Sequence, residues 1–305
     1  MTTEKIFDEA LKNILSEDEI LKDEPMKHHT TFRVGGPAEY YLRPKKEQVA
    51  EVLRLCLTYQ KEYLIIGNGS NLLVSDKGIS GVVIEIGKQM DEITVDGTTI
   101  YAQAGAMLSK TAHAALEAGL TGMEFAAGIP GCVGGAVVMN AGAYGGEMKD
   151  ILKSVTVLTA DGQEKELTPG ELDMSYRHSS ITEEHYMVLG VTIALEAGSQ
   201  EQIRAKMEEL KEKRVEKQPL EYPSAGSTFK RPEGYFAGKL IMDAGLRGFQ
   251  VGGAAVSEKH CGFVINKEKA TASDVYRLIQ EVQQEVYWQF GVKLETEVKM
   301  VGDFR

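Results

Sequence analysis

The feature that most constrains the fold is a glycine-rich segment between residues 128 and 146. It reads Gly128-Ile129-Pro130-Gly131-Cys132-Val133-Gly134-Gly135 and, a few residues later, Asn140-Ala141-Gly142-Ala143-Tyr144-Gly145-Gly146. Each glycine loses more backbone entropy on folding than an alanine would. The chain as a whole holds 32 glycines in 305 residues, which exceeds the usual ~7%. We therefore expect a ligand to approach the backbone closely along this segment.

A second glycine turn follows a short apolar stretch at residues 63–66, which we expect to be a buried strand. The turn is Gly67-Asn68-Gly69-Ser70-Asn71. It can be an ordinary tight turn, or a nest of backbone N–H groups that holds a pyrophosphate. It is neither a Walker loop nor the dinucleotide fingerprint, because no Gly-Lys-Ser/Thr follows and the next segment is a strand. A long dinucleotide cofactor lying between two lobes would need both glycine segments.

The order of the patterns predicts an α+β protein in three parts. Residues 1–87 combine an N-terminal helix with a β-α-β start, and residues 88–206 carry short extended pieces around one helix. A third part is expected at residues 207–305. Helices are predicted near residues 47–59, 108–116, 199–217 and 273–290, each from apolar spacing typical of one helical face. After the last helix we expect a strand pair through Val292 and Val298.

Charge and cysteine content limit the classes of function. The formal net charge of −11 argues against general binding to nucleic acid. No apolar run approaches the ~20 residues that span a bilayer, and the acidic N-terminal helical pattern is unlike a signal peptide. We expect a cytoplasmic protein without membrane insertion and without an obligate protein partner. The three cysteines are far apart and predict no metal site.

Seven motifs occur together between residues 29 and 241, within a resemblance that runs from about residue 28 to residue 297. They are His29-Thr30-Thr31-Phe32-Arg33-Val34-Gly35-Gly36-Pro37, the turn at residues 67–71, Gly128-Ile129-Pro130-Gly131, Asn140-Ala141-Gly142-Ala143-Tyr144-Gly145, Tyr176-Arg177-His178-Ser179, Gly226-Ser227-Thr228-Phe229-Lys230-Arg231-Pro232 and Gly238-Lys239-Leu240-Ile241. In this combination and order the chain resembles the UDP-N-acetylenolpyruvoylglucosamine reductase family. Only residues 179–186 separate the Tyr-Arg motif from the next strand. The chain therefore resembles the shorter subtype, which lacks an inserted tyrosine lid.

The resemblance implies a fold and a reaction. The family has the vanillyl-alcohol-oxidase-like (PCMH-type) FAD-binding fold, in which residues 1–87 and 88–206 would be the two FAD-binding lobes and residues 207–305 the substrate-binding domain. NADPH would reduce a noncovalently bound FAD. Hydride would then pass to C3 of the enolpyruvyl group, and protonation at C2 would give the lactyl ether of UDP-N-acetylmuramate. The product serves peptidoglycan synthesis, and with it cell-wall biogenesis, cell shape, the cell cycle and cell division.

The resemblance also assigns roles to residues. Arg177 matches the arginine that stabilises the enolate, Ser227 the proton donor, and Glu297 a glutamate that assists the intermediate. On periodicity alone, Glu297 would be read as the solvated face of an edge strand. The residues expected to bind FAD are Gly67, Asn68, Gly69, Ser70, Asn71, Gly128, Ile129, Pro130, Gly131, Gly134, Gly135, Asn140, Ala141 and Gly142. The candidates for binding the nucleotide sugar are Tyr176, Lys217, Lys230 and Arg231.

Three questions stay open at the level of the sequence. His260 is either a polar residue of the pocket or an ordinary turn histidine. The chain could be another flavoenzyme of the same fold, an oxidase or dehydrogenase acting on an alcohol or a lactone. It could also be a nucleotide-sugar binding protein without catalytic activity. Bound flavin would exclude this last alternative.

Overall fold

The computed structural model describes residues 3–305 and divides into two compact units. Unit 1 comprises the described residues up to Lys22, together with Tyr40–Asn68 and Gly81–Lys213. Unit 2 comprises Asp23–Glu39, Gly69–Ser80 and Arg214–Arg305. Both units are discontinuous in sequence, whereas the sequence analysis assumed contiguous parts. The finer division at residues 87 and 206 stays a prediction.

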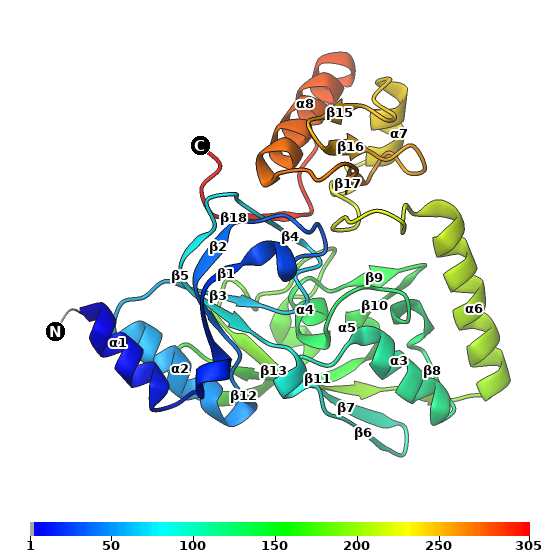
Figure 1. The fold of residues 1–305 in the computed structure, drawn as a ribbon. Coiled ribbons are helices and arrows are strands. Elements are labelled where there is room, and N and C mark those ends of the chain that lie inside the picture. Colours follow the sequence, from blue (N-terminus) through cyan, green and yellow to red (C-terminus); the bar gives the residue numbers. More distant parts are fainter. Residues whose placement is uncertain (1–2) are drawn as a thin grey trace. The chain divides into compact units, whose positions relative to one another are not determined.

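A four-stranded sheet belongs mainly to unit 1, and the borders between the units fall inside three of its strands. Its order is β1-β2-β5-β3. The strands are β1 (Ile20–Pro25), β2 (Pro37–Leu42), β5 (Ile79–Glu85) and β3 (Tyr63–Ile66). Strands β3 and β5 run parallel, with Tyr63 opposite Val82. Two helices, α1 (Thr3–Lys12) and α2 (Lys46–Thr58), lie side by side (Figure 1) and bury their apolar faces in the core of this unit.

A second, five-stranded sheet supports the glycine-rich segment of unit 1. Its order is β12-β11-β13-β7-β6, and all neighbouring strands are antiparallel. The strands are β6 (Ile93–Asp96), β7 (Thr99–Gln103), β11 (Leu152–Leu158), β12 (Glu164–Leu167) and β13 (Met187–Ala194). The helices of this part are α3 (Leu108–Glu117), α4 (Val133–Val138), α5 (Met148–Ile151) and α6 (Gln200–Lys217), the last of which continues into unit 2.

Shorter elements connect these parts. Two two-stranded ladders are formed by β8 (Leu120–Thr121) with β14 (Glu196–Ala197) and by β9 (Gly142–Ala143) with β10 (Gly146–Glu147). The 3₁₀ helices are η1 (Glu17–Glu19), η2 (Met26–His28), η3 (Lys88–Met90), η4 (Glu124–Ala126) and η5 (Pro169–Leu172). Within the described chain, no helix combines the length and the apolar character needed to cross a membrane.

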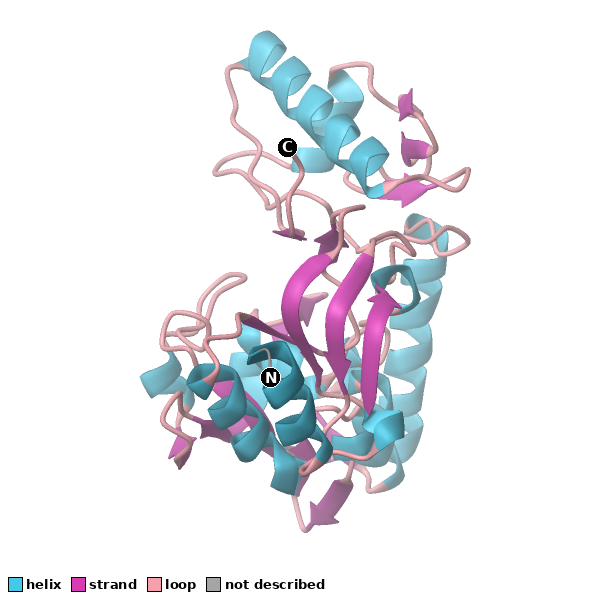
Figure 2. Ribbon diagram, turned by 60° about the vertical axis from the view of Figure 1, so that its left-hand side comes forward, coloured by secondary structure: helices cyan, strands magenta, loops and turns pink. Residues whose placement is uncertain are grey.

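Unit 2 contains a three-stranded sheet of order β15-β16-β17, packed against one long helix. The strands are β15 (Gln250–Val251), β16 (Ala254–Val256) and β17 (Val264–Asn266), and the helices are α7 (Ala237–Asp243) and α8 (Ala272–Phe290). Figure 2 shows the three short strands beside α8. The apolar stripe of α8 is completely buried, as its spacing predicts, and consists of Val275, Leu278, Ile279, Val282 and Val286.

The expected strand pair through Val292 and Val298 is wrong. The last strand is instead β18 (Lys299–Val301), which pairs in parallel with β4 (Leu72–Val74), so that Lys299 lies opposite Leu72. Local periodicity could not reveal this partner, because β4 lies far away in the sequence. The pairing explains why residues 69–80 belong to unit 2.

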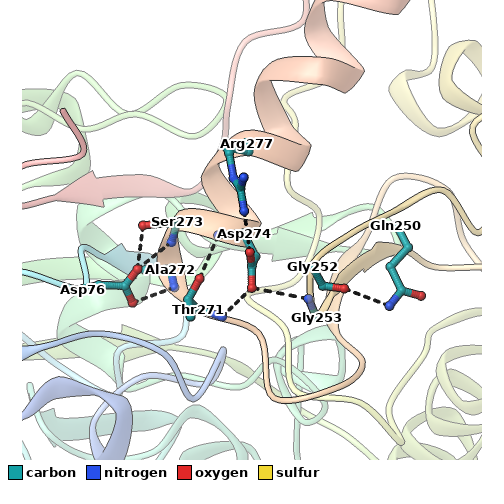
Figure 3. Close-up of polar contacts among 9 residues, drawn as sticks. All are labelled: Asp76, Gln250, Gly252, Gly253, Thr271, Ala272, Ser273, Asp274 and Arg277. Atoms are coloured by element: carbon teal, nitrogen blue, oxygen red, sulfur yellow. Dashed lines mark hydrogen bonds and ion pairs between the residues drawn. The ribbon is translucent and has the colours of Figure 1, made fainter.

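The same early segment also caps the N-terminus of α8. The Asp76 carboxylate accepts hydrogen bonds from the N–H groups of Ala272 and Ser273, each at 2.8 Å, and from the Ser273 hydroxyl at 2.7 Å (Figure 3). Thr271 and Asp274 form a capping box at the same helix end. Exposed N–H groups in the first turn of a helix are stabilised by such acceptors and by negative charge. Asp76 therefore joins residues 69–80 to the C-terminal part of unit 2.

The long helices agree with the sequence predictions. The predicted helices at residues 47–59, 108–116, 199–217 and 273–290 are observed as α2, α3, α6 and α8. All of them begin or end within one or two residues of the predicted bounds. Apolar spacing was sufficient here because each helix buries one continuous face.

Candidate active site

The turn at residues 67–71 follows directly after β3, and its first glycine is required by a close contact. A Cβ atom at Gly67 would lie 2.1 Å from the Cys132 sulfur. Cys132 is buried, and this burial raises the pKa of its thiol, while hydrogen bonds from the N–H groups of Gly135 and Asn68 act in the opposite direction. The thiol therefore joins the two glycine segments within unit 1.

The remainder of the turn offers donors to an anion. The N–H groups of Gly69 and Ser70 donate no hydrogen bond to any described residue. Thr31 donates its N–H to the Gly69 carbonyl at 3.2 Å, and its own hydroxyl oxygen is buried without a partner in the described chain. Unpaired backbone donors beside a buried hydroxyl fit a phosphate group. These residues therefore fit the pyrophosphate of FAD, and the sequence analysis did not assign Thr31.

The members of the second glycine segment differ in exposure. Gly128, Pro130 and Gly135 are exposed and Ile129 is half-buried, so their backbone is accessible to a ligand. Gly131 and Gly134 are buried. The Gly131 carbonyl accepts the Leu108 N–H at 3.0 Å, and the Gly134 N–H donates to the Ala104 carbonyl at 2.8 Å. These two glycines thus hold the segment against the loop that precedes α3.

Asn140 supports the glycine segment through its side chain. It is fully buried, and its amide nitrogen donates to the Glu147 carboxylate at 2.7 Å and to the Ser175 carbonyl at 3.1 Å. Its amide oxygen accepts the Lys149 N–H at 2.9 Å. The neighbouring Ala141 is also buried. Asn140 therefore links the glycine segment to the chain around Ser175.

Tyr176 and Arg177 lie at the tip of a tight turn in unit 1. Ser175 and His178 close the turn by two backbone hydrogen bonds, each of 3.1 Å. Arg177 has a φ of 56°, a left-handed conformation that is uncommon for a residue other than glycine. Its guanidinium lies 5.1 Å from the centre of the Tyr176 ring and 3.5 Å from the Gly142 carbonyl oxygen. The turn thus brings a predicted catalytic residue beside a predicted cofactor-binding residue.

In unit 2 the segments around Ser227 and Glu297 are paired. The Glu297 N–H donates to the Thr228 carbonyl at 2.8 Å, and the Lys230 N–H donates to the Glu295 carbonyl at 2.9 Å. The Glu297 carbonyl accepts the side-chain amide of Asn71 at 3.0 Å. Two predicted catalytic residues, Ser227 and Glu297, are thus brought to neighbouring positions of two paired segments, which form an isolated bridge at Phe229 and Thr296, next to the end of the residue 67–71 turn.

The predicted substrate-binding cations of unit 2 lie on its surface. The Lys230 ammonium group lies 3.3 Å from the Glu295 carboxylate, and both side chains are exposed. The Arg231 guanidinium lies 4.1 Å from the centre of the Phe236 ring. Lys217 is exposed in the last turn of α6. Lys230 and Arg231 are adjacent in the chain, whereas Lys217 lies in a different element, and the roles of all three stay predictions.

His260 is part of a compact loop between β16 and β17. Its Nδ1 atom accepts the Gly262 N–H at 3.1 Å, and its ring packs edge-on against Phe263 with 5.0 Å between ring centres. Burial lowers the pKa of His260. An accepting Nδ1 and a lowered pKa both describe a neutral imidazole. The residue therefore has a structural place in this loop.

The site holds no obvious metal-binding group. Among residues 3–305, no cluster of three or more His, Cys, Asp or Glu side chains is arranged to bind a metal ion. Arg177 belongs to unit 1, whereas Ser227 and Glu297 belong to unit 2. Each unit thus holds part of the set of predicted catalytic residues.

Two known protein families match this chain, one in its N-terminal part and one in its C-terminal part. Residues 38–168 match the FAD binding domain family, and residues 218–301 match the C-terminal domain of UDP-N-acetylenolpyruvoylglucosamine reductase. A UDP-N-acetylenolpyruvoylglucosamine reductase from Agathobacter rectalis is 60% identical over 297 residues, covering 93% of this chain and 95% of that protein. The enzyme of the same name from Clostridium perfringens is 53% identical, with 97% of each chain covered.

Solved structures agree with the sequence comparisons. The crystal structure of UDP-N-acetylenolpyruvylglucosamine reductase from Thermus caldophilus has a TM-score of 0.79 at 37% identity, covering 91% of this chain and 97% of that chain. The structure of p-cresol methylhydroxylase, at 14% identity and a TM-score of 0.50, covers 64% of this chain and 44% of that chain, and shows likeness of fold alone. The expected α+β FAD-binding fold is thereby confirmed. With relatives of 53–60% identity matched over nearly their whole length, the chain belongs to the UDP-N-acetylenolpyruvoylglucosamine reductase family.

Proposed function

We propose that this protein is an FAD-dependent oxidoreductase that reduces the enolpyruvyl group of UDP-N-acetylglucosamine enolpyruvate, with NADPH as the hydride donor. The product is the lactyl ether UDP-N-acetylmuramate. Family membership over nearly the whole chain supports the reaction. The alternative of an oxidase acting on an alcohol or lactone is not favoured, because the flavoenzyme outside this family described above shares only 14% identity.

The turn at residues 67–71 and the exposed members of the residue 128–135 segment would hold the FAD. The unpaired N–H groups of Gly69 and Ser70 and the hydroxyl of Thr31 would face its pyrophosphate. When bound, FAD supplies hydride transfer from NADPH to C3 of the enolpyruvyl group. All other chemistry has to come from side chains of the protein.

Arg177 would bind the carboxylate of the enolpyruvyl group. A planar guanidinium donates two parallel hydrogen bonds to a carboxylate and stays charged at any physiological pH. Negative charge develops on this carboxylate and on C2 when hydride reaches C3, so the cation would stabilise it. The tight turn closed by Ser175 and His178 supports this role, because it fixes the backbone on both sides of Arg177.

Ser227 would deliver the proton to C2, and Glu297 would assist it. The observation that carries this assignment is the backbone hydrogen bond from Glu297 to Thr228, the residue after Ser227. This bond fixes the backbone at Ser227 relative to the backbone at Glu297. A serine hydroxyl is a weak acid, so its proton transfer requires a fixed position and polar neighbours.

The candidates for binding the nucleotide sugar remain Tyr176, Lys217, Lys230 and Arg231. A nucleotide-sugar substrate and NADPH suit a cytoplasmic location, and the product would serve peptidoglycan synthesis and, through it, cell shape and division.

Separate measurement of the two half-reactions tests the assignment of Ser227. In Ser227→Ala, we expect NADPH to reduce the flavin at nearly the parent rate, because this step needs no proton at C2. Reoxidation by the enolpyruvyl sugar nucleotide should be about 100- to 10,000-fold slower, the usual range for a lost proton-transfer group. Stopped-flow flavin absorbance records both steps.

Ser224→Ala is the matched control for this experiment. It removes the same hydroxyl three residues earlier, at a backbone bridge to Ile265. Both half-reactions of the control should stay near the parent rates. Reoxidation of Ser227→Ala at the parent rate would show that Ser227 is not the proton donor, and Glu297 would then be tested in its place.

A further inference from the structure

The chain before Ser227 leaves the edge of a sheet and returns to it one residue after Ser227. Strand β17 is one of the two edge strands of its sheet. The Pro223 carbonyl accepts the Asn266 N–H at 2.9 Å, and Ser224 forms a backbone bridge to Ile265. Gly226 then turns the chain with a φ of 76°, and no atom lies within 4 Å of the position where a Cβ would stand. Ser227 thus lies on a short excursion from the sheet.

Thr228 ends the segment that leaves the sheet, and its N–H, its carbonyl and its hydroxyl oxygen each form a hydrogen bond there. It is completely buried. Its N–H donates to the Gly262 carbonyl at 2.9 Å, and its carbonyl accepts the Glu297 N–H at 2.8 Å. Its hydroxyl oxygen accepts the Val264 N–H at 3.0 Å. The side chain therefore takes the place of the backbone carbonyl that would normally accept from an edge strand.

We infer that Thr228 is a positioning residue for Ser227, and that its hydroxyl acts by fixing the end of the excursion to β17. This inference rests on the proposed role of Ser227 as proton donor. The Ser227–Thr228 peptide is held on one side by the Gly262 carbonyl, and the hydroxyl bond to Val264 is a second, independent attachment of the same residue. A threonine has few χ1 rotamers because it is β-branched. The hydroxyl bond therefore limits how far Ser227 can move, and a displacement of about 1 Å can slow a reaction about 100-fold.

The test compares Thr228→Val with Thr228→Ser. Valine has nearly the shape of threonine but offers no acceptor, so the Val264 N–H would lose its partner inside the protein. Serine keeps the acceptor. We expect reoxidation of the reduced flavin by the enolpyruvyl sugar nucleotide to be about 10- to 100-fold slower in Thr228→Val. Thr228→Ser should stay within a few-fold of the parent. Reduction by NADPH and the substrate concentration at half-saturation should change little in either variant.

Two further readouts separate positioning from general stability. Hydrogen exchange of the Val264 amide should be faster in Thr228→Val and near the parent rate in Thr228→Ser. In a Ser227→Ala background, Thr228→Val should slow reoxidation by less than about twofold, because effects that act through one group do not add. If the valine variant does not fold, Thr228→Cys replaces it, since a thiol is only a weak acceptor.

The outcomes can be told apart. If Thr228→Val reoxidises at the parent rate while Ser227→Ala is slow, the inference is wrong and the proposed function stands. The inference is also wrong if Thr228→Val has its full effect in the Ser227→Ala background, because Thr228 would then act independently of Ser227. If the reduced parent protein is not reoxidised by the enolpyruvyl sugar nucleotide, the proposed function fails, and the inference fails with it.

Discussion

His260 shows how a single residue combines packing and protonation. Its Nδ1 atom accepts a backbone N–H from Gly262, and a protonated ring could not accept this bond. Burial lowers its pKa in the folded protein. The loop it belongs to also supplies the Gly262 carbonyl that holds Thr228. The protonation state of His260 is thus linked to the folded geometry of this loop.

We predict that His260 makes the protein less stable in mild acid. An unfolded histidine has a pKa near 6.5, and the folded pKa is lower. As the pH falls below about 6.5, the unfolded state takes up a proton that the folded state does not, so the free energy of unfolding decreases. In His260→Asn, whose side-chain oxygen can accept the same N–H but does not titrate, this part of the decrease should be absent.

Urea unfolding between pH 8 and pH 5 measures this difference. The parent curve should fall more steeply than the His260→Asn curve below about pH 6.5, and the two should run parallel above it. Parallel curves over the whole range would show that His260 does not contribute to the acid sensitivity.

The residues of the site were predictable only in part from the sequence. The family resemblance assigned roles to Ser227 and Glu297, but the periodicity around Glu297 is that of an exposed edge strand. Ser227 and Glu297 lie near each other because Thr228 pairs with Glu297, and this pairing joins distant parts of the chain. Thr31 was not a candidate for a similar reason, because its buried, unpartnered hydroxyl becomes apparent only when the fold places Thr31 beside Gly69.

Among the elements, the two glycine segments are joined by one buried thiol. The sulfur of Cys132 occupies the space that a side chain at residue 67 would need. Protein packing alone therefore requires a glycine at this position, and the predicted part of Gly67 in binding FAD stays a prediction. Within unit 1, the contact also ties the positions of Gly67 and Asn68 to that of α4, which begins directly after Cys132.

We predict that Gly67→Ala is destabilising and that Cys132→Ala largely compensates it. The added Cβ would overlap the sulfur, and overpacking of this kind reduces the free energy of unfolding by about 1–3 kcal/mol. Without the sulfur, the nearest atom of residue 132 is its Cβ, at 3.7 Å, an ordinary contact. Urea unfolding of the parent, both single variants and the double variant measures the coupling. Additive losses would disprove the contact.

The N-terminus of α8 carries the second element-scale prediction. Asp76→Ala removes three hydrogen bonds to the first turn of this helix. We expect a loss of about 1–2 kcal/mol in the free energy of unfolding, as for other lost helix caps. The matched control is Asp303→Ala, which removes an exposed ion pair of 2.9 Å with Lys77 and two exposed contacts with Arg305, its N–H at 2.9 Å and its guanidinium at 3.4 Å. It should change stability by less than about 0.5 kcal/mol. Equal losses in the two variants would contradict the capping role.

The elements themselves divide into those that were predictable and those that were not. The helix α8 was predictable because its buried residues recur along the sequence at the spacing of one helical face. Strand β18 was not, because its three residues acquire a partner only in β4. Short strands carry too little periodicity to identify the strand with which they pair.

At the scale of the whole molecule, both glycine segments argue for a cofactor held without a covalent bond. Residues 67–71 contain neither histidine nor cysteine. The nearby thiol of Cys132 is buried and its pKa is raised by burial, so little reactive thiolate forms. We predict that acid precipitation releases all of the yellow colour into the supernatant. Colour that stays in the pellet, together with a mass increase equal to one flavin, would contradict this prediction.

The parallel pairing of β4 with β18 has a consequence for the synthesis of the protein. The ribosome produces residues 72–74 long before residues 299–301, yet within the described chain each of these strands pairs only with the other. A nascent chain that contains residues 218–298, nearly all of the region matched by the C-terminal domain family, would still present an unpaired strand edge at β4. Unpaired edges attract other strands. We therefore expect the pairing of β4 with β18 to form only after residues 299–301 have left the ribosome, and a chain that lacks these residues would keep an unpaired edge at β4.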